Sequence, residues 1–211
     1  MTRGGAMIWL VRHAQAQGAQ GLYIGSTDLP LSDEGQNQAR ALAQGMAGLG
    51  LKALYSSPLR RAQDTAAPLA RACGLATVNL VPELAEIHMG SWEGLSMEEI
   101  RQEQPEAHAA RGRDFAGFRT PGGETFAEVA VRALRGLAKM AGGPRPCAVV
   151  THAGVIRVLL CHVCSFGLNE LFRFKPDPAH AWGLEPNGPG WSLRHENLSA
   201  GELASLADQP R

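Results

Sequence analysis

Two histidines stand where strand-like segments end, beside an arginine that could help them bind a small anion. His13 follows the apolar run 8–12, which ends in Arg12. His152 follows a second apolar run, 147–151. Because neighbouring side chains on a strand point to opposite faces, Arg12 and His13 can share a ligand only if the strand ends there. Ligands of open α/β sheets bind beyond the carboxyl ends of the strands, which predicts a site built from Arg12, His13 and His152.

The elements that must position these residues alternate along the chain. Apolar runs predict strands at 53–56 and 77–81, and a hairpin whose strands are 181–185 and 191–195. Helix starts are predicted at Ser32, Ser57, Ser96, Thr125 and about Val155, with a glutamate three residues after Ser96 and Thr125 in the capping-box pattern. Strands that alternate with helices imply βαβ units. The predicted fold class is α/β, a three-layer α/β/α sandwich with a mostly parallel central sheet.

One of these helices carries two specific predictions. Ser57 followed by Pro58 predicts an N-cap with proline at the first helical position. Pro68 lies inside the same helix and should kink or divide it, because proline donates no amide hydrogen bond and crowds the preceding turn.

Composition excludes several classes of protein. Twenty basic residues balance twenty acidic ones, which argues against a nucleic-acid-binding surface and leaves a small, locally held anion as the partner. The 45% of hydrophobic residues can supply a core, and we expect one domain over 1–211, with 82–123 as a cover over the site and 105–123 as its most mobile part. The run 6–11 is short for a secretory segment, and no run approaches the roughly 18 apolar residues of a membrane span. These features predict a cytoplasmic protein without a membrane partner.

Six segments, in a familiar order, carry a family resemblance. They are VRHAQ at 11–15, GSTDLPLSDEG at 25–35, YSSPLRRAQDTA at 55–66, ELAEIHMGSWEG at 83–94, PGGETFAEVAVR at 121–132 and THAGVIR at 151–157. Together they resemble the histidine phosphatase superfamily, which has the phosphoglycerate-mutase-like fold, over residues 7 to about 175.

The resemblance implies a role for each candidate site residue. His13 would be the nucleophile that becomes transiently phosphorylated, and Glu86 would be the proton donor to the leaving group. Arg12, Arg61 and His152 would clamp the phosphoryl oxygens. A neutral imidazole is nucleophilic near pH 7, and fixed cationic donors suit the charge that spreads over three oxygens in phosphoryl transfer. The implied mechanism needs no metal and no cofactor.

Neighbouring residues compete for two of these roles. Arg60 is the alternative to Arg61, but the family arginine stands immediately before alanine, which favours Arg61 and leaves Arg60 as a solvated partner. Glu83 is the alternative to Glu86, but Glu86 precedes Gly90 at the spacing of the family acid, which favours a structural role for Glu83.

Three further residues could contact the substrate. Ser26 and Thr27 are predicted substrate-binding residues with a turn as the alternative, and Glu124 could instead be a charge at a helix start. The chain also departs from the family pattern in two places. Ala14 replaces the usual glycine and adds a methyl group beside the phosphate, and Gly18-Ala19-Gln20 stands where an asparagine is often found.

Several reactions fit the same residues. The segments at 21–25 and 171–174 look most like the α-ribazole phosphatase branch, which favours hydrolysis of α-ribazole 5′-phosphate in cobalamin nucleotide-loop synthesis. The alternatives are a phosphoglycerate mutase or a broad-specificity phosphatase, and a non-catalytic module that binds a phosphorylated ligand ranks last. In each case the partner is a small-molecule phosphate monoester.

Overall fold

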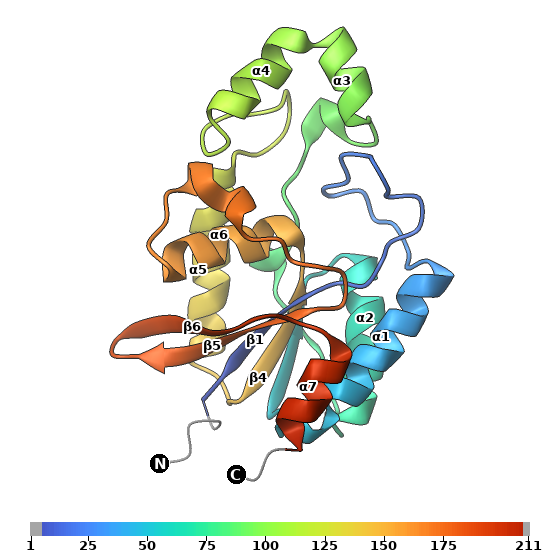
Figure 1. Cartoon of the computed structure of the whole chain (residues 1–211), viewed down its shortest axis with the longest axis vertical. Helices are drawn as coiled ribbons and strands as arrows, with labels where there is room; N and C mark the ends of the chain where they lie inside the picture. Colours follow the sequence, from blue (N-terminus) through green and yellow to red (C-terminus); the bar gives the residue numbers. More distant parts are fainter. Residues whose placement is uncertain (1–5, 209–211) are drawn as a thin grey trace.

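The computed structural model describes residues 6–208, in which six strands form one mixed sheet (Figure 1). The strands are β1 (Ile8–Arg12), β2 (Ala53–Ser56), β3 (Asn79–Leu80), β4 (Cys147–Thr151), β5 (Ala181–Asn187) and β6 (Gly190–Leu198). Their order across the sheet is β3-β2-β4-β1-β5-β6. The first four strands run parallel, and β5 and β6 add an antiparallel hairpin at one edge.

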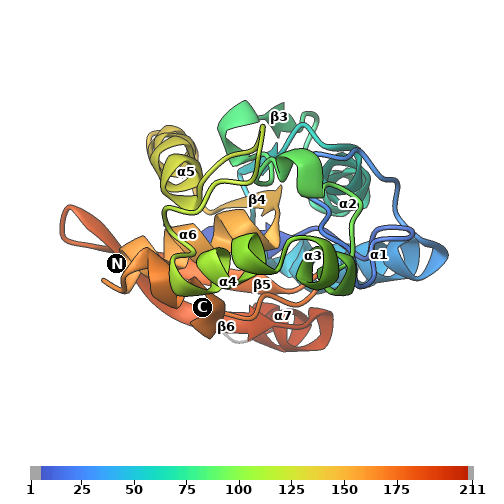
Figure 2. The ribbon, with the colours of Figure 1, turned by 90° about the horizontal axis from the view of Figure 1, so that it is seen from above.

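Helices cover both faces of this sheet (Figure 2). One face carries α1 (Asp33–Met46), α2 (Arg60–Ala72) and α7 (Ala200–Ala207), and the other carries α5 (Phe126–Ala141) and α6 (Ala153–Val163). Successive residues of β1 alternate between the two apolar cores, so that Ile8 and Leu10 pack with α5 and α6 while Trp9 and Val11 pack with α1 and α2. The predicted three-layer α/β/α sandwich is confirmed.

Short helices lie within the connecting segments. They are α3 (Met97–Glu103), α4 (Pro105–Arg113) and the 3₁₀ turns η1 (Ala47–Leu49), η2 (Pro82–Leu84), η3 (Gly90–Trp92) and η4 (Leu168–Arg173). The pair α3 and α4 lies at the opposite end of the molecule from α7 (Figure 1). Fully buried Trp92 joins this pair to the body, because its Nε1 donates to Gln104 of the chain between α3 and α4 and its ring lies 5.5 Å from those of Tyr23 and Phe118.

The predicted helix caps are largely present. Ser32 accepts from the amide of Gly35 at the start of α1, and both capping boxes, at Ser96 and Thr125, close reciprocally. These caps could be predicted because each depends on residues only three apart in the sequence.

The start of α2 was predicted wrongly. The helix begins at Arg60 with Leu59 at the N-cap position. Ser57, the first residue after β2, lies outside the helix, and its hydroxyl contacts His152 and the amide of Leu59. Pro68 does not divide the helix, which continues to Ala72. Leu69 and Ala70, which follow the proline, are buried in the core, and this packing holds the helix together across the missing hydrogen bond.

Two other predicted elements differ in length, and the helices α4 and α7 were not predicted. Just Asn79 and Leu80 of the predicted strand 77–81 pair with β2, and α6 spans 153–163 rather than 155–166. Among residues 6–208, no helix combines the length and the apolar character that crossing a membrane requires.

Candidate active site

The register of the two central strands brings His13 and His152 together. Arg12 pairs with Thr151 across β1 and β4, and the amide of His13 donates to the Thr151 carbonyl at 2.8 Å. Each histidine is the first residue beyond its strand. Their ring centroids are 5.0 Å apart, and only 8% of His13 and none of His152 is exposed.

The hydrogen bonds of His13 define which ring nitrogen is free. Its Nδ1 lies 2.7 Å from the carbonyl oxygen of Ala14, which can only accept, so Nδ1 carries the proton. The other nitrogen, Nε2, therefore has a lone pair and accepts from Arg61 Nε at 3.2 Å. Burial, reinforced by the positive charge of Arg61, lowers the pKa of His13 to about 3. The ring is thus neutral at pH 7.

Arg61, not Arg60, points at the nucleophile candidate. Arg61 is 1% exposed, and its Nη1 and Nη2 donate to the carbonyls of Thr27 and Gly25 at 2.7 and 2.6 Å. Arg60 is exposed and pairs with Asp64 on the surface of α2. This placement agrees with the solvated role expected for Arg60.

Arg12 enters the same region from β1. Its Nη1 donates to the carbonyl of Pro176 at 2.8 Å, and its Nε is buried without a partner among residues 6–208. Burial lowers the pKa of Arg12, while the charges of Glu86 and Asp177 raise it. The guanidinium therefore lies within electrostatic reach of Glu86.

Glu86 sits at the N-terminus of α6. Its Oε2 accepts from the amide of Gly154 at 3.0 Å, and its Oε1 accepts from the amide of Ile87 at 2.9 Å. Glu83, the alternative acid, instead forms an ion pair with Lys139 of α5. The structure thus brings Glu86, not Glu83, to the arginines of the site.

Arg132, which the sequence did not single out, holds the segment that carries Glu86. It donates to the carbonyls of Glu83, Ala85 and Glu86, and it pairs with Glu124 through two contacts of 2.9 Å. Glu124 also accepts from the amide of His88 at 3.0 Å. These contacts make Glu124 part of the support for this segment, and its interaction with substrate stays a prediction.

Ser26 and Thr27 are tied to Glu93. The Ser26 and Thr27 hydroxyls donate to its carboxylate at 3.1 and 2.7 Å, and amides of Gly25, Ser26 and Met89 donate as well. Burial would raise the pKa of Glu93, but the hydrogen bonds outweigh it and lower the pKa to about 2. This geometry favours the turn alternative, and substrate contact by the two hydroxyls stays a prediction.

Two other residues, which the sequence analysis did not identify, contact the segments that carry the two histidines. The Ser57 hydroxyl lies 2.7 Å from His152 Nε2, and Thr65 Oγ1 accepts from the amide of Ala14 at 3.0 Å. Ala14 itself is fully buried in the core against α1 and α2. Both hydroxyl residues lie in the 55–66 segment of the resemblance, but nothing local distinguishes them from capping or helix-surface residues.

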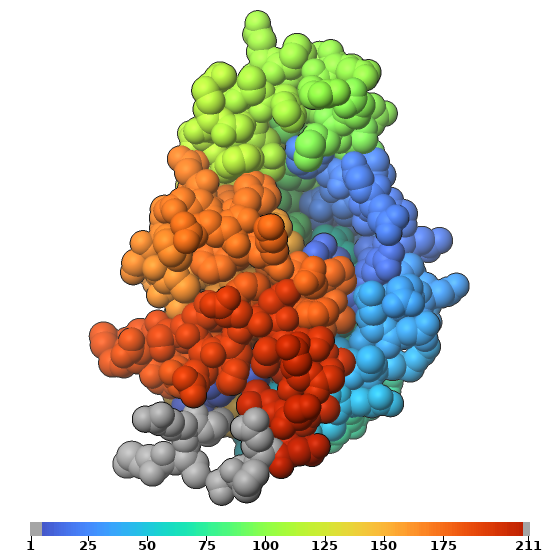
Figure 3. All heavy atoms as spheres, in the orientation of Figure 1, coloured from blue at the N-terminus to red at the C-terminus, as the bar shows by residue number. Residues whose placement is uncertain are grey.

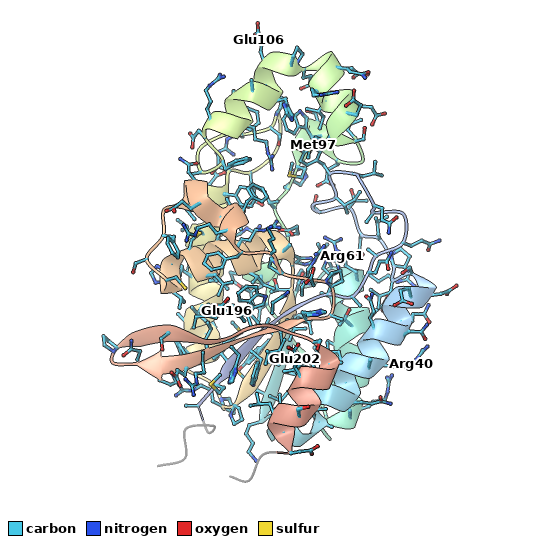
Figure 4. All side chains as sticks on the ribbon, in the orientation of Figure 1. Arg40, Arg61, Met97, Glu106, Glu196 and Glu202 are labelled. Carbon is cyan, nitrogen blue, oxygen red and sulfur yellow. The ribbon has the colours of Figure 1, made fainter. Side chains whose placement is uncertain are left out.

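A hollow opens beside these groups, between the loop that follows β1 and the segment around α6 and η4 (Figure 3). Arg61 lies next to it (Figure 4). Two more half-buried arginines approach the region, Arg157 of α6 and Arg111 of α4, which lie 4.8 and 6.0 Å from the ring of Phe172. None of the ion pairs among residues 6–208 involves Arg12, Arg61, Arg111 or Arg157, although the charge of Glu86 acts on three of them from a greater distance.

Comparison with known proteins agrees with this arrangement. The sequence model of the histidine phosphatase superfamily (branch 1) matches residues 8–199. A metal-independent phosphoserine phosphatase from Arabidopsis thaliana is 38% identical over 165 residues, which cover 74% of this chain and 68% of the relative. The adenosylcobalamin/alpha-ribazole phosphatase of Escherichia coli is 30% identical, over 92% of this chain and 96% of the relative. Other relatives are longer: the chain matches them at 36% identity and spans about half (47%) of their length.

A solved structure supports the same grouping. The native structure of mycobacterial glucosyl-3-phosphoglycerate phosphatase superimposes with a TM-score of 0.83 at 28% identity, and the match covers 92% of this chain and 100% of that one.

Proposed function

This chain belongs to the histidine phosphatase superfamily, and we propose that it hydrolyses phosphomonoesters through a phosphohistidine formed on His13. One observation carries the proposal: the lone pair of a buried, neutral imidazole faces a guanidinium, with a second buried imidazole beside it. A neutral nucleophile next to fixed positive charge suits attack on a phosphate ester, because the charge on the transferring oxygens is stabilised as it shifts.

In the first step, His13 Nε2 attacks phosphorus while the bond to the ester oxygen breaks. The electron pair of that bond goes to the leaving alcohol, which takes a proton from Glu86. Arg12, Arg61 and His152 hold the other three oxygens. The hydrogen bond from Nδ1 to the Ala14 carbonyl stabilises the positive charge that the ring acquires.

In the second step, water attacks the phosphohistidine. Glu86, now a carboxylate, accepts a proton from the water, and the electrons of the phosphorus–nitrogen bond return to Nε2. Inorganic phosphate leaves and the starting state of the site is restored.

α-Ribazole 5′-phosphate is the favoured substrate. The segments at 21–25 and 171–174 support it, as does the likeness to the Escherichia coli relative along nearly the full length of both chains. Residues 171–174 lie next to the site, because the ring of Phe172 contacts both Arg111 and Arg157.

A small phosphorylated carboxylate, such as phosphoserine, is the second candidate. The observation that favours it is that Arg111 and Arg157 form no ion pair with a carboxylate among residues 6–208, while the charge of Arg157 interacts with the predicted acid Glu86. A substrate with a second anionic group would supply the missing negative charge. A phosphoglycerate mutase remains the alternative reaction, and it would return the phosphoryl group to substrate instead of water.

Hydrolysis of p-nitrophenyl phosphate by wild type, His13→Ala and His162→Ala tests the proposal. His162 is an exposed histidine of α6 and serves as the matched control. We expect His162→Ala to match wild type and His13→Ala to lose activity by several orders of magnitude. Equal low turnover in all three proteins would contradict the proposal and favour a binding module. With the active enzyme, hydrolysis rates for α-ribazole 5′-phosphate, phosphoserine and 3-phosphoglycerate rank the substrates. Incubation of 3-phosphoglycerate with a bisphosphoglycerate primer separates hydrolysis, which releases phosphate, from mutase activity, which yields 2-phosphoglycerate.

A further inference from the structure

Among residues 6–208, the ring of His152 has one hydrogen-bond partner. Its Nε2 lies 2.7 Å from the Ser57 hydroxyl, and both residues are fully buried. Its Nδ1 is also buried and has no partner among residues 6–208. Burial, followed by the nearby charges of His13 and Arg61, holds the pKa of His152 well below its usual value. The ring is therefore neutral at pH 7, and only one of its two nitrogens carries a proton.

The hydrogen bonds of Ser57 decide which nitrogen that is. A hydroxyl has one hydrogen to donate and two lone pairs. The amide of Leu59 donates to Ser57 Oγ at 3.2 Å, so one lone pair is used. If His152 Nε2 also donated to Oγ, the hydroxyl hydrogen would be buried with no acceptor among residues 6–208. If the hydroxyl instead donates to Nε2, the hydroxyl hydrogen and the Leu59 amide are both satisfied, and the Nδ1–H of His152 is the one group of this pair left unpaired among residues 6–208. The opposite arrangement leaves two groups unpaired, the hydroxyl hydrogen and the Nδ1 lone pair, and therefore costs more.

We infer that Ser57 is a positioning residue, which donates to His152 Nε2 and thereby holds the proton of His152 on Nδ1. The Nδ1–H group of a ring beside His13 is then the donor to a phosphoryl oxygen, a consequence that rests on the proposed function. In the opposite tautomer, Nδ1 would present a lone pair to that oxygen and repel it. The role of Ser57 is thus to fix the ring in its useful protonation state, as the partners of metal-binding histidines do.

Nitrogen NMR of the full chain tests the tautomer without any turnover. In protein labelled with ¹⁵N-histidine, two-bond proton–nitrogen correlations distinguish a protonated from an unprotonated ring nitrogen, and the signals of His152 are assigned by their loss in His152→Gln. We expect a protonated Nδ1 and an unprotonated Nε2 in wild type. A protonated Nε2 would overturn the inference, and this measurement needs no variant of Ser57.

Two matched variants test the cause. Ser57→Ala removes the donor, and Ser56→Ala removes an equally buried hydroxyl that donates to the Ser57 carbonyl at 2.8 Å and does not contact the histidine. We expect the His152 nitrogen shifts to move toward a mixture of tautomers in Ser57→Ala and to stay unchanged in Ser56→Ala. Unchanged shifts in folded Ser57→Ala would overturn the positioning role. Ser57→Thr keeps the hydroxyl and is expected to retain the wild-type tautomer.

Kinetics tests the donor role of Nδ1 separately. We expect kcat/KM for p-nitrophenyl phosphate to fall about 10- to 100-fold in Ser57→Ala, the usual effect of removing such a partner, and to change little in Ser56→Ala. An equal loss in both variants would overturn the donor role. A wild-type protein with the expected tautomer but without phosphatase activity would contradict the proposed function and leave the role of Ser57 in fixing the tautomer supported.

Discussion

The carboxylate of Glu86 lies so close to Gly154 that a larger side chain at position 154 would displace it. An added Cβ would lie 2.3 Å from Glu86 Oε1, and the backbone amide of Gly154 donates to Oε2 of the same carboxylate at 3.0 Å. Gly154, at the start of α6, therefore leaves space for the carboxylate of the proposed proton donor and binds it through the backbone amide.

Gly154→Ala should displace Glu86 and impair proton donation. Because p-nitrophenolate leaves without a proton, we expect less than a tenfold loss with p-nitrophenyl phosphate and about a hundredfold loss of kcat/KM with an alkyl phosphate. Glu86→Gln should give the same pattern. Gly201→Ala in α7 is the control, because a Cβ there meets nothing within 4 Å. Equal losses with both substrates would remove Glu86 from the role of acid.

Arg61→Lys should be far more harmful than Arg60→Lys. The Arg61 guanidinium spans His13, Gly25 and Thr27 with three separate N–H groups, and a lysine ammonium cannot reproduce this fork. Steady-state kinetics should show a loss of about 10²–10³-fold in kcat for the first variant and near-wild-type values for the second. Comparable activity of the two variants would show that Arg61 is not the clamp residue.

Stability should decline between pH 7 and pH 5. The pKa of His13 is about 3 in the folded protein and that of His152 is also lowered, whereas both are near 6.5 in the unfolded chain. Below pH 6.5 the unfolded chain therefore binds more protons. His13 contributes a loss of about 2 kcal/mol over this interval, and His152 contributes a loss in the same direction. The lowered pKa of Glu93 acts only below about pH 4.5 and does not interfere.

Urea unfolding at the two pH values measures this effect. The His13→Ala variant should lose about 2 kcal/mol less than wild type between pH 7 and pH 5. The same pH-dependent loss in both proteins would mean that His13 is not held neutral by the fold.

Arg157→Gln should discriminate between the two candidate substrate classes. Arg157 forms no ion pair in the part of the chain that the structure describes, and its charge interacts at longer range with Glu86, Arg12 and Arg111. If it binds a substrate carboxylate, the variant should lose about 10- to 100-fold in kcat/KM for phosphoserine and little for p-nitrophenyl phosphate. Arg173→Gln is the control, since Arg173 also stacks on a phenylalanine, at 4.2 Å from the Phe166 ring, but is exposed and paired with Glu170. Equal effects on both substrates would argue against a carboxylate site.

Features that depend on residues close together in the chain could be predicted from the sequence, and contacts between residues far apart in the chain were missed. The cap at Ser32 and the capping boxes depend on residues three apart, and the layered fold follows from alternating apolar patterns, so both could be predicted. The contact of Ser57 with His152 joins residues 95 apart in the chain, and the pattern Ser-Pro predicted a cap there instead.

The supports of the site were missed for the same reason. Arg132 contacts carbonyls 46 to 49 residues away, and Glu93 binds the 25–27 turn across 66 to 68 residues. Nothing in the local sequence of either residue shows these partners. By contrast, the six family segments pointed to His13, His152, Arg61 and Glu86, which the structure brings near one another, while their roles stay predictions.

The central claim is that His13 takes the phosphoryl group covalently. The most direct test is to quench the enzyme rapidly, without acid, during turnover of a phosphate monoester. The peptide that contains His13 is then analysed by mass spectrometry. The account predicts a fraction of this peptide heavier by one phosphoryl group, with the group on His13, labile to acid and absent from His13→Ala. Turnover at the wild-type rate with the phosphoryl group on another residue, or with none on the protein in the presence of excess substrate, would contradict it.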